Sequence, residues 1–463
     1  MKETTRPVLY RTMKYWGKKP HNIWGQYIKK YCPKNGTVLD PFVGSGMTYF
    51  EAIKIKRIPI TIDINPMSEV SIKCLTKRNV NESEIISAAN KIIDEIKKHD
   101  FYKNEYVCQC DNCGEAVEIY NYKINGKATI SYNCPKCNKK ITKEINYKET
   151  SYTIDKWVPT KKMSDIASIS DSFLKKLKSD EIYNLWTNRN LKILSEIYDL
   201  ILKIKDDDIK ELLVFAFLQC LHLTSKMCVP RSEKSNRPLS TSWGRPAYMI
   251  SKKTFEQNPL IAFKKAVFNG TGILKALQSS NNYLGKILVN NGKHYLGNAN
   301  KILKNIPDNT IDLVITDPPY GNLIQYGDLS EVWVSWLEHY KENYKIDHKN
   351  EITINKNKDK EYYKASLKNV FIKINKVLKD EGLFILTFNS NKKEDWENLF
   401  FSLKHSNFYI EKFVYQKNKR SSEANVKAKK GIAISDYYLI CKKGKWKNDH
   451  IHNFLEDWGI EVK

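Results

Sequence analysis

Two short loops carry the residues of this chain whose types and spacing could do chemistry. One is Asp40-Pro41-Phe42-Val43-Gly44-Ser45-Gly46, and the other is Asp317-Pro318-Pro319-Tyr320. Each follows an apolar run, residues 37–39 and 311–315, of the kind that forms a buried strand. In sheets of parallel strands, ligands bind beyond the carboxyl ends of the strands. Both loops are therefore predicted to contribute to one binding site.

The glycine-bearing loop is suited to hold an anionic group. Gly44 and Gly46 permit backbone conformations and close approaches that side chains forbid. The helix predicted to follow offers free N–H groups and a partial positive charge at its N-terminus. The carboxylate at the methionyl end of S-adenosylmethionine would fit there, and so would a phosphate. The spacing Gly-x-Gly-x-x-Gly is absent from this loop, which disfavours an NAD site. An ordinary tight turn is the structural alternative.

Asp63 ends a second predicted strand, residues 58–64. A carboxylate at that position can accept hydrogen bonds from both hydroxyls of a ribose. A helix cap is the structural alternative, because Asp and Asn favour cap positions.

The Asp317 loop suits the chemistry of an exocyclic amino group. The nitrogen of such a group is a poor nucleophile, because its lone pair is delocalised into the ring. Hydrogen bonds accepted by the Asp317 carboxylate and the Pro318 carbonyl would favour its nucleophilic form, and the two prolines stiffen the loop. Tyr320 offers a face on which an extruded base can stack. The two loops together predict methyl transfer from S-adenosylmethionine to the amino group of a nucleic-acid base.

The elements that must position these loops follow an alternating pattern, which predicts an α/β fold with a mostly parallel sheet. Helices of this core are expected at 22–32, 46–55, 367–378 and 395–405. Strands are expected at 37–42, 58–64, 294–298, 311–317, 383–388, 408–416 and 436–443, the last two as a late antiparallel hairpin. The predicted domains are residues 1–75 and 291–463, which form the two parts of the core, and a large insertion, residues 76–290, which splits them.

The insertion is predicted to contain a zinc ribbon at 106–147 and a helical part at 170–280. Its helices are expected at 83–99, 190–205, 208–228 and 254–277, the last with interruptions near Pro259 and Gly270. Residues 229–250 mix cations with aromatic side chains, which suits guanine edges and displaced bases. The residues concerned are Arg231, Lys234, Arg237, Trp243, Arg245 and Tyr248. We therefore expect the insertion to recognise the target.

Two Cys-x-x-Cys pairs indicate a metal site. Cys110 and Cys113 form the first pair, and Cys134 and Cys137 form the second. Two such knuckles predict a tetrahedral, structural Zn²⁺ site with four thiolate ligands. Cys108 is an alternative ligand with poorer spacing. A redox dithiol is the other possibility, in a context that lacks thioredoxin-like features.

The motifs resemble those of S-adenosylmethionine-dependent DNA amino-methyltransferases, and most closely the adenine-specific DNA methylases that contain a zinc ribbon. The two loops are similar to motifs I and IV, residues 15–21 to motif X, residues 63–66 to motif II, and residues 297–299 to motif III. Arg189-Asn190-Leu191 and residues 326–330 are further shared traits. The resemblance implies a Rossmann-like methyltransferase sheet, with Asp317, Pro318, Pro319 and Tyr320 catalytic. The cofactor-binding residues that it implies are Trp16, Lys19, Asp40, Pro41, Phe42, Gly44, Gly46, Asp63, Asn65 and Asn298.

Asn298 is a departure from the pattern, because many relatives have an acid in motif III that holds the adenine ring of the cofactor. The function expected from the resemblance is methylation of the N6 amino group of a flipped adenine in double-stranded DNA. Cytosine N4 methylation, guanine N2 methylation of RNA and a non-catalytic zinc-ribbon DNA-binding protein are the alternatives. The resemblance also implies a setting in restriction-modification or phage defence, with protein partners from such systems.

Bulk properties agree with a nucleic-acid partner. The chain has 463 residues and a formal net charge of +25, which a Lys-rich proteome would also explain. A basic cluster lies between the last two predicted strands and could contact phosphates. Its members are Lys417, Lys419, Arg420, Lys427, Lys429 and Lys430. No signal peptide is evident, and the longest apolar stretch, residues 212–223, is too short to span a bilayer. We therefore expect a cytoplasmic protein without membrane partners.

Overall fold

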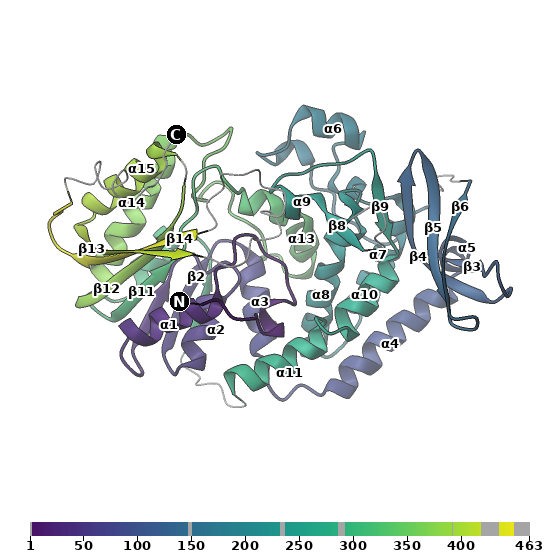
Figure 1. The fold of residues 1–463 in the computed structure, drawn as a ribbon, viewed down its shortest axis with the longest axis horizontal. Coiled ribbons are helices and arrows are strands. Elements are labelled where there is room, and N and C mark those ends of the chain that lie inside the picture. Colours follow the sequence, from purple (N-terminus) through teal and green to yellow (C-terminus); the bar gives the residue numbers. More distant parts are fainter. Residues whose placement is uncertain are drawn as a thin grey trace.

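A seven-stranded sheet organises the first and last parts of the chain (Figure 1). The computed structural model describes residues 2–146, 151–231, 237–285, 292–390, 392–417 and 435–448. The strand order is β10-β2-β1-β11-β12-β14-β13. The bounds are β1 (Thr37–Asp40), β2 (Ile58–Asp63), β10 (Lys293–Leu296), β11 (Ile311–Thr316), β12 (Leu378–Phe388), β13 (Phe408–Lys417) and β14 (Ser435–Lys443).

The first five strands in this order are parallel to one another, and β14 runs antiparallel to both β12 and β13. This confirms the predicted α/β class, the mostly parallel sheet and the late antiparallel hairpin. Along the chain, the strands that follow β1 are added on one side and those from β11 onward on the other. The order therefore reverses between β1 and β11, which is where open α/β sheets bind ligands.

Side chains of the central strands alternate between two cores. On β1, Val38 belongs to one apolar core and Leu39 to the other, as the twofold period of a strand requires. Helices on both sides of the sheet supply the matching apolar faces. On the Val38 side these are α1 (His21–Tyr31), α2 (Met47–Lys54) and α3 (Pro66–Thr76); on the Leu39 side they are α12 (Ala299–Ile302), α14 (Lys360–Val377) and α15 (Lys393–Lys404).

The segment between the two parts of the large sheet folds as a helical body, a smaller five-stranded sheet and the two-stranded sheet of β7 and β8, seen on the right of Figure 1. Its helices are α4 (Glu82–Lys98), α5 (Asp100–Tyr106), α6 (Asp171–Leu177), α7 (Asn188–Leu202), α8 (Asp207–Leu221), α9 (Thr241–Gly244), α10 (Pro259–Phe268) and α11 (Ile273–Leu284). Its strands are β3 (Val107–Gln109), β4 (Ala116–Asn125), β5 (Lys127–Cys134), β6 (Lys139–Ile145), β7 (Cys228–Pro230), β8 (Pro238–Ser240) and β9 (Thr254–Gln257).

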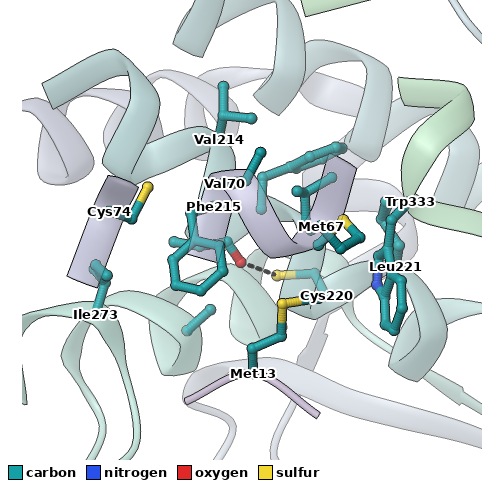
Figure 2. Close-up of a cluster of buried hydrophobic side chains, with 14 of the residues drawn as sticks. Met13, Met67, Val70, Cys74, Val214, Phe215, Cys220, Leu221, Ile273 and Trp333 are labelled. Carbon is teal, nitrogen blue, oxygen red and sulfur yellow. Dashed lines mark hydrogen bonds between the residues drawn. The ribbon is translucent and has the colours of Figure 1, made fainter. Parts of the chain in front are cut away.

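The helical body is joined to the large sheet through an apolar core rather than a linker. Figure 2 shows Val70 of α3, Phe215 of α8, Ile273 of α11 and Trp333 gathered in one cluster. Phe215 and Ile273 are fully buried. Each side chain of this kind contributes about 1.5–3 kcal/mol when it leaves water. The cluster therefore fixes the helical body against the helices that bear the binding site.

Several sequence predictions were wrong or incomplete. Residues 254–257 form β9, which pairs with β4, although a helix was expected there. The helix predicted to run to residue 228 ends at Leu221, because residues 228–230 form a strand that pairs with β8. The helix α13 (Tyr326–Tyr340), which follows the Asp317 loop, was not predicted.

Candidate active site

A cavity lies at the carboxyl edge of the large sheet, over the place where the strand order reverses. Its empty volume is about 970 Å³, part of which is open to solvent. Its walls come from segments that are far apart in the sequence: residues within 15–24, 40–48, 63–65, 297–299, 317–327 and 350–352. The cavity brings together all the predicted site residues except the four cysteines and Gly46, Pro318 and Tyr320, which do not line it.

The glycine loop forms one wall of the cavity and needs its glycines. Gly44 has φ +54°, and a Cβ there would lie 3.2 Å from the ring of Tyr15. Gly46 has φ +82°, and a Cβ there would lie 2.9 Å from Phe50 and Ile72. Both values of φ fall in the left-handed region that favours glycine. The loop therefore passes close to its neighbours and leads directly into α2.

The side chain of Asp40 stabilises the glycine loop through hydrogen bonds. Its Oδ1 accepts hydrogen bonds from the Phe42 N–H at 3.0 Å and from the Thr316 hydroxyl at 2.6 Å. Its Oδ2 accepts one from the Thr48 hydroxyl at 2.5 Å. Burial raises the pKa of Asp40 to about 7, although these three donors act in the opposite direction. Because Thr316 directly precedes Asp317, Asp40 links the glycine loop to the Asp317 loop.

Asp63 lies beside the glycine loop at the end of β2. Its Oδ2 accepts the Gly44 N–H at 2.7 Å, and its Oδ1 accepts the Asn65 N–H at 2.8 Å. Burial raises the pKa of Asp63 to about 6, against the effect of these two backbone donors. Each carboxylate oxygen retains a lone pair for a further donor, so the geometry permits the predicted contact with a ribose.

Asp317 is held through one oxygen only. Its Oδ1 accepts hydrogen bonds from the hydroxyl of Tyr320 and from the hydroxyl of Thr387, the latter at 2.7 Å. Lys19 Nζ lies 3.3 Å from the same oxygen. Within the part of the chain that the structure describes, no hydrogen bond reaches Oδ2 of Asp317. This oxygen is free to accept a donor from a substrate.

Neighbouring side chains also contact Pro319 and Tyr320 of the Asp317 loop. The hydroxyl of Tyr363 donates to the Pro319 carbonyl at 2.7 Å, whereas no described donor reaches the carbonyl of Pro318. Tyr320 packs edge-on against Phe388, with ring centroids 5.0 Å apart, and Lys19 Nζ lies 5.3 Å from its ring centroid. Tyr320 therefore helps to orient Asp317, while the base-stacking role expected of it stays a prediction.

Lys19 contacts two residues of the Asp317 loop. Its ammonium lies 2.8 Å from Asp436 Oδ1 and 3.1 Å from the Tyr320 hydroxyl. Burial opposes its charge, but the carboxylates of Asp317 and Asp436 raise the pKa of Lys19 well above its usual range. Burial likewise raises the pKa of Asp317, while the Lys19 charge lowers it. The lysine therefore remains a cation that compensates the Asp317 carboxylate.

Trp16 connects the cavity to the helical body. Its indole N–H donates to the Ser242 carbonyl at 2.9 Å, and its ring stacks on Trp243 with centroids 4.8 Å apart. Trp243 and Tyr248 were expected to contact displaced bases, but both side chains are only 7% exposed. That expectation is wrong for these two residues, because the interface between Trp16 and α13 buries them. Lys234 and the basic cluster from Lys419 to Lys430 lie outside the described residues.

Asn65 and Asn298 are both engaged as helix caps. The Asn65 side chain accepts the Met67 N–H and donates to Ser330 at 2.7 Å. The Asn298 oxygen accepts the Lys301 N–H at 3.2 Å, and its amide donates to the Asn350 carbonyl at 2.8 Å. Their amide groups thus position the cavity walls, and their predicted contacts with the cofactor stay predictions.

The structure adds site residues that sequence reasoning missed. Tyr15 stacks on Tyr326, with ring centroids 5.8 Å apart and a 16° angle between the rings. Glu351, only 8% exposed, lines the same cavity. Glu351 comes from a connection without helix or strand, residues 341–359, where no periodic pattern singles out any residue.

Behind Glu351 lies a cluster of buried charges around His348. Its Nε2 is 2.5 Å from Glu331 Oε1, and its Nδ1 is 3.5 Å from Asp328 Oδ1. Burial lowers the pKa of His348, but the neighbouring carboxylates of Glu331 and Glu351 outweigh burial and raise it to about 9. The imidazole is therefore a cation held between carboxylates. Lys161 joins the cluster through Glu331 at 2.7 Å.

The four cysteines of the paired motifs come together at one end of the small sheet. Their sulfur atoms all lie within 4.8 Å of one another, with Cys110 and Cys137 3.7 Å apart and Cys113 and Cys134 3.4 Å apart. Four sulfurs about 2.3 Å from one tetrahedral ion would lie about 3.8 Å apart, so this donor set fits Zn²⁺. Cys108 is not part of the group and packs beside it.

Arg189 and Asn190 tie the small sheet to the helical body. The Arg189 guanidinium makes a bidentate pair with Glu256, at 2.8 and 2.7 Å, and lies 3.8 Å from the ring centroid of Tyr122. The Asn190 amide donates to the carbonyls of Thr224 and Gln257. Both side chains are buried, which gives them a structural role between α7, β4 and β9.

Comparisons with known proteins bear mainly on the large sheet. Across the described residues, no helix has both the length and the apolar character needed to cross a membrane. No curated protein has significant sequence similarity to this chain. A solved structure titled "Crystal Structure of PH0851" aligns with 15% identity over 40% of this chain and 39% of its own length, with a TM-score of 0.19. A similarity of that size carries no structural argument.

The family comparison is more informative. Residues 2–73 and 311–461 match the family model described as DNA methylase. The first matched segment contains the glycine loop, Asp63 and Lys19, and the second contains Asp317 and Glu351. The chain is thus similar, in the two segments that supply most of the cavity, to a family of N6 and N4 DNA methyltransferases, and this match supports a DNA methyltransferase.

Proposed function

We propose that this protein transfers a methyl group from S-adenosylmethionine to the N6 amino group of adenine in double-stranded DNA. The observation that carries the proposal is the arrangement of Asp317. Tyr320, Thr387 and Lys19 fix its Oδ1, while Oδ2 and the Pro318 carbonyl have no donor among the described residues. Two free acceptors in one rigid loop match the two N–H groups of an exocyclic amine.

These acceptors would activate the amino nitrogen. Hydrogen bonds from its N–H groups to Asp317 Oδ2 and the Pro318 carbonyl withdraw the lone pair from the ring, and so make the nitrogen nucleophilic. When the nitrogen forms a bond to the methyl carbon, it must lose one N–H proton, and Asp317 Oδ2 can accept it. Burial raises the pKa of Asp317 and strengthens it as a base.

The glycine loop and Asp63 form the proposed cofactor half of the site. The N–H groups at the start of α2 suit a carboxylate, and the free lone pairs of Asp63 suit ribose hydroxyls. S-adenosylmethionine, when bound, supplies a methyl group on a sulfonium that is open to direct attack. The remaining wall residues, including Phe42 and Trp16, would exclude water from the reacting groups.

An adenine inside a duplex cannot reach this cavity, so the base must leave the stack. We propose that the segment from residue 76 to 290 selects that base, with a structural Zn²⁺ on Cys110, Cys113, Cys134 and Cys137. The spacing of the four sulfurs supports this ion. The buried Arg189 network and the core of Figure 2 support a rigid mounting of this segment on the catalytic sheet.

Cytosine N4 is the second candidate for the acceptor, because the matched family covers both reactions. Both amino groups offer the same pair of N–H donors to Asp317 and Pro318. The aspartate at the first position of the loop favours adenine, by resemblance to adenine-specific enzymes. A role with restriction or defence proteins is proposed on the same resemblance.

DNA modification in a host that expresses the protein tests the proposal and separates the two bases. Genomic DNA is digested to nucleosides, and methylated species are measured by mass spectrometry. N6-methyladenine is expected with the wild-type protein, and none above background with Asp317→Ala. N4-methylcytosine in its place would establish the second candidate, and neither nucleoside would contradict both.

A further inference from the structure

Glu351 places a second carboxylate beside Asp63 in the cavity. It lines the cavity wall and is buried. Its negative charge is close enough to contribute to the raised pKa of Asp63, after burial as the main cause. A cavity that buries two carboxylates at one end is suited to a ligand rich in N–H or O–H donors at that end.

Among the described residues, the side chain of Glu351 accepts a hydrogen bond through one oxygen, and its other oxygen has only a longer ion-pair contact. Its Oε1 accepts the Gly327 N–H at 2.9 Å, near the start of α13. Its Oε2 has His348 Nδ1 as a neighbour at 3.7 Å, which is beyond hydrogen-bond distance. The fit against α13 is tight, since a Cβ on Gly327 would lie 2.6 Å from this Oε2. The carboxylate is thus oriented by the protein and keeps acceptor capacity.

The segment that carries Glu351 is anchored to the cavity wall. Asn298 donates its amide to the Asn350 carbonyl at 2.8 Å, and Lys358 donates its ammonium to the Glu351 carbonyl at 2.7 Å. The side chain of Asn298 makes that contact and also caps the N-terminus of α12. Glu351, which directly follows Asn350, can therefore supply the acceptor expected at Asn298.

We propose that Glu351 binds the nucleoside half of the cofactor, through the 6-amino group of its adenine or through its ribose hydroxyls. The inference rests on the proposed function, because it requires S-adenosylmethionine as the ligand. It assigns to this chain a cofactor-binding residue in the connection between α13 and α14. The alternative is that Glu351 serves only to hold the N-terminus of α13.

Binding of two ligands by the full-length protein tests the inference. S-adenosylhomocysteine has both the nucleoside and the amino-acid end, whereas 5′-methylthioadenosine has the nucleoside alone. Glu351→Gln keeps an acceptor for the Gly327 N–H but removes the charge. We expect it to weaken calorimetric binding of both ligands by the same factor, about tenfold, with unchanged thermal unfolding of the free protein. Glu342→Gln, at an exposed position of the same connection, should change neither affinity.

Analogues of 5′-methylthioadenosine distinguish the two donor groups. If Glu351 binds the 6-amino group, the effect of Glu351→Gln should vanish with the analogue that lacks this group. If Glu351 binds the ribose hydroxyls, the effect should vanish with the analogue that lacks them. Should the Gln variant fail to fold, Glu351→Asp retracts the charge by one methylene and is expected to weaken both ligands too.

Several outcomes would overturn the inference. Wild-type affinity of Glu351→Gln for both ligands would leave Glu351 a purely structural role. A loss confined to S-adenosylhomocysteine would place the carboxylate at the amino-acid end. A loss that persists with both analogues would exclude both donor groups. Absence of binding by the wild-type protein would be different, because it would contradict the proposed function itself.

Discussion

Lys19 Nζ lies 3.3 Å from Asp317 Oδ1, so that a residue near the start of the chain compensates the charge of the Asp317 carboxylate. Asp436 of β14 holds the same ammonium from the other side, at 2.8 Å. The three residues come from separate segments that meet only at the edge of the folded sheet. The reactivity of Asp317 is therefore set by the tertiary structure and not by its own loop alone.

Removal of the Lys19 charge should change the pH dependence of catalysis. The ammonium favours the carboxylate form of Asp317, so in Lys19→Met the carboxyl group keeps its proton to higher pH. We expect the acid limb of kcat/KM for methyl transfer to move to higher pH. Lys29→Met, at an exposed position of α1, should leave the profile unchanged. An unshifted acid limb in Lys19→Met would show that this pair does not control the reaction.

Cofactor affinity should fall in acid because of Asp63. Its pKa is raised to about 6, so the carboxylate proposed to accept ribose hydroxyls is present above pH 6 and is lost below it. Binding of S-adenosylhomocysteine should be roughly tenfold weaker at pH 5 than at pH 7, by the proton competition expected from that pKa. Asp63→Asn should bind weakly and with little pH dependence over this range. Equal wild-type affinity at both pH values would argue against a contact through Asp63.

Arg189 should be needed for stability rather than for DNA contact. Arg189→Ala leaves Glu256 buried without its partner, which typically costs about 3–5 kcal/mol. Urea denaturation should show that loss, while cofactor binding persists under conditions where the variant is folded. Arg245→Ala, an exposed neighbour in sequence of Trp243, is the control for a general effect of arginine removal. An Arg189→Ala protein with normal stability but poor DNA binding would contradict the structural role.

The cysteine cluster should hold one metal ion. Elemental analysis of the purified wild-type protein is expected to give about one zinc per chain, and Cys134→Ser should lose it and unfold at lower temperature. Cys108→Ser is the matched control, since Cys108 lies beside the cluster without joining it, and it should retain the metal. Zinc loss in Cys108→Ser with zinc retained in Cys134→Ser would reverse the ligand assignment.

The central strands could be predicted because a strand that is covered on both faces needs a run of apolar residues. Residues 311–315 are almost wholly apolar, as a strand covered on both faces requires, and β11 is buried along nearly its whole length. The glycine loop and the Asp317 loop were recognisable because few residue types can serve there. The late hairpin followed from two alternating runs near the end of the chain.

The elements that were missed depend on contacts between distant segments. α13 is buried on most sides, with Trp333 and Trp336 both inside the core, so it lacks the polar stripe that marks a surface helix. Residues 254–257 become a strand only because β4 accepts them as a partner. Glu351 is placed by contacts with α13 and by the bond between Asn298 and Asn350, and Trp243 is buried between Trp16 and α13; no local pattern encodes either position.

Transfer of a labelled methyl group to DNA is the most direct test of the account. Purified protein is incubated with S-adenosylmethionine labelled in its methyl group and with genomic DNA of mixed sequence, and the label in the DNA is counted and assigned to a base. The account predicts label on the N6 nitrogen of adenine, reduced roughly 10²–10⁴-fold in Asp317→Ala, with S-adenosylhomocysteine binding retained in that variant. Label that persists undiminished in Asp317→Ala, or no label with a wild-type protein that binds the cofactor, would contradict it.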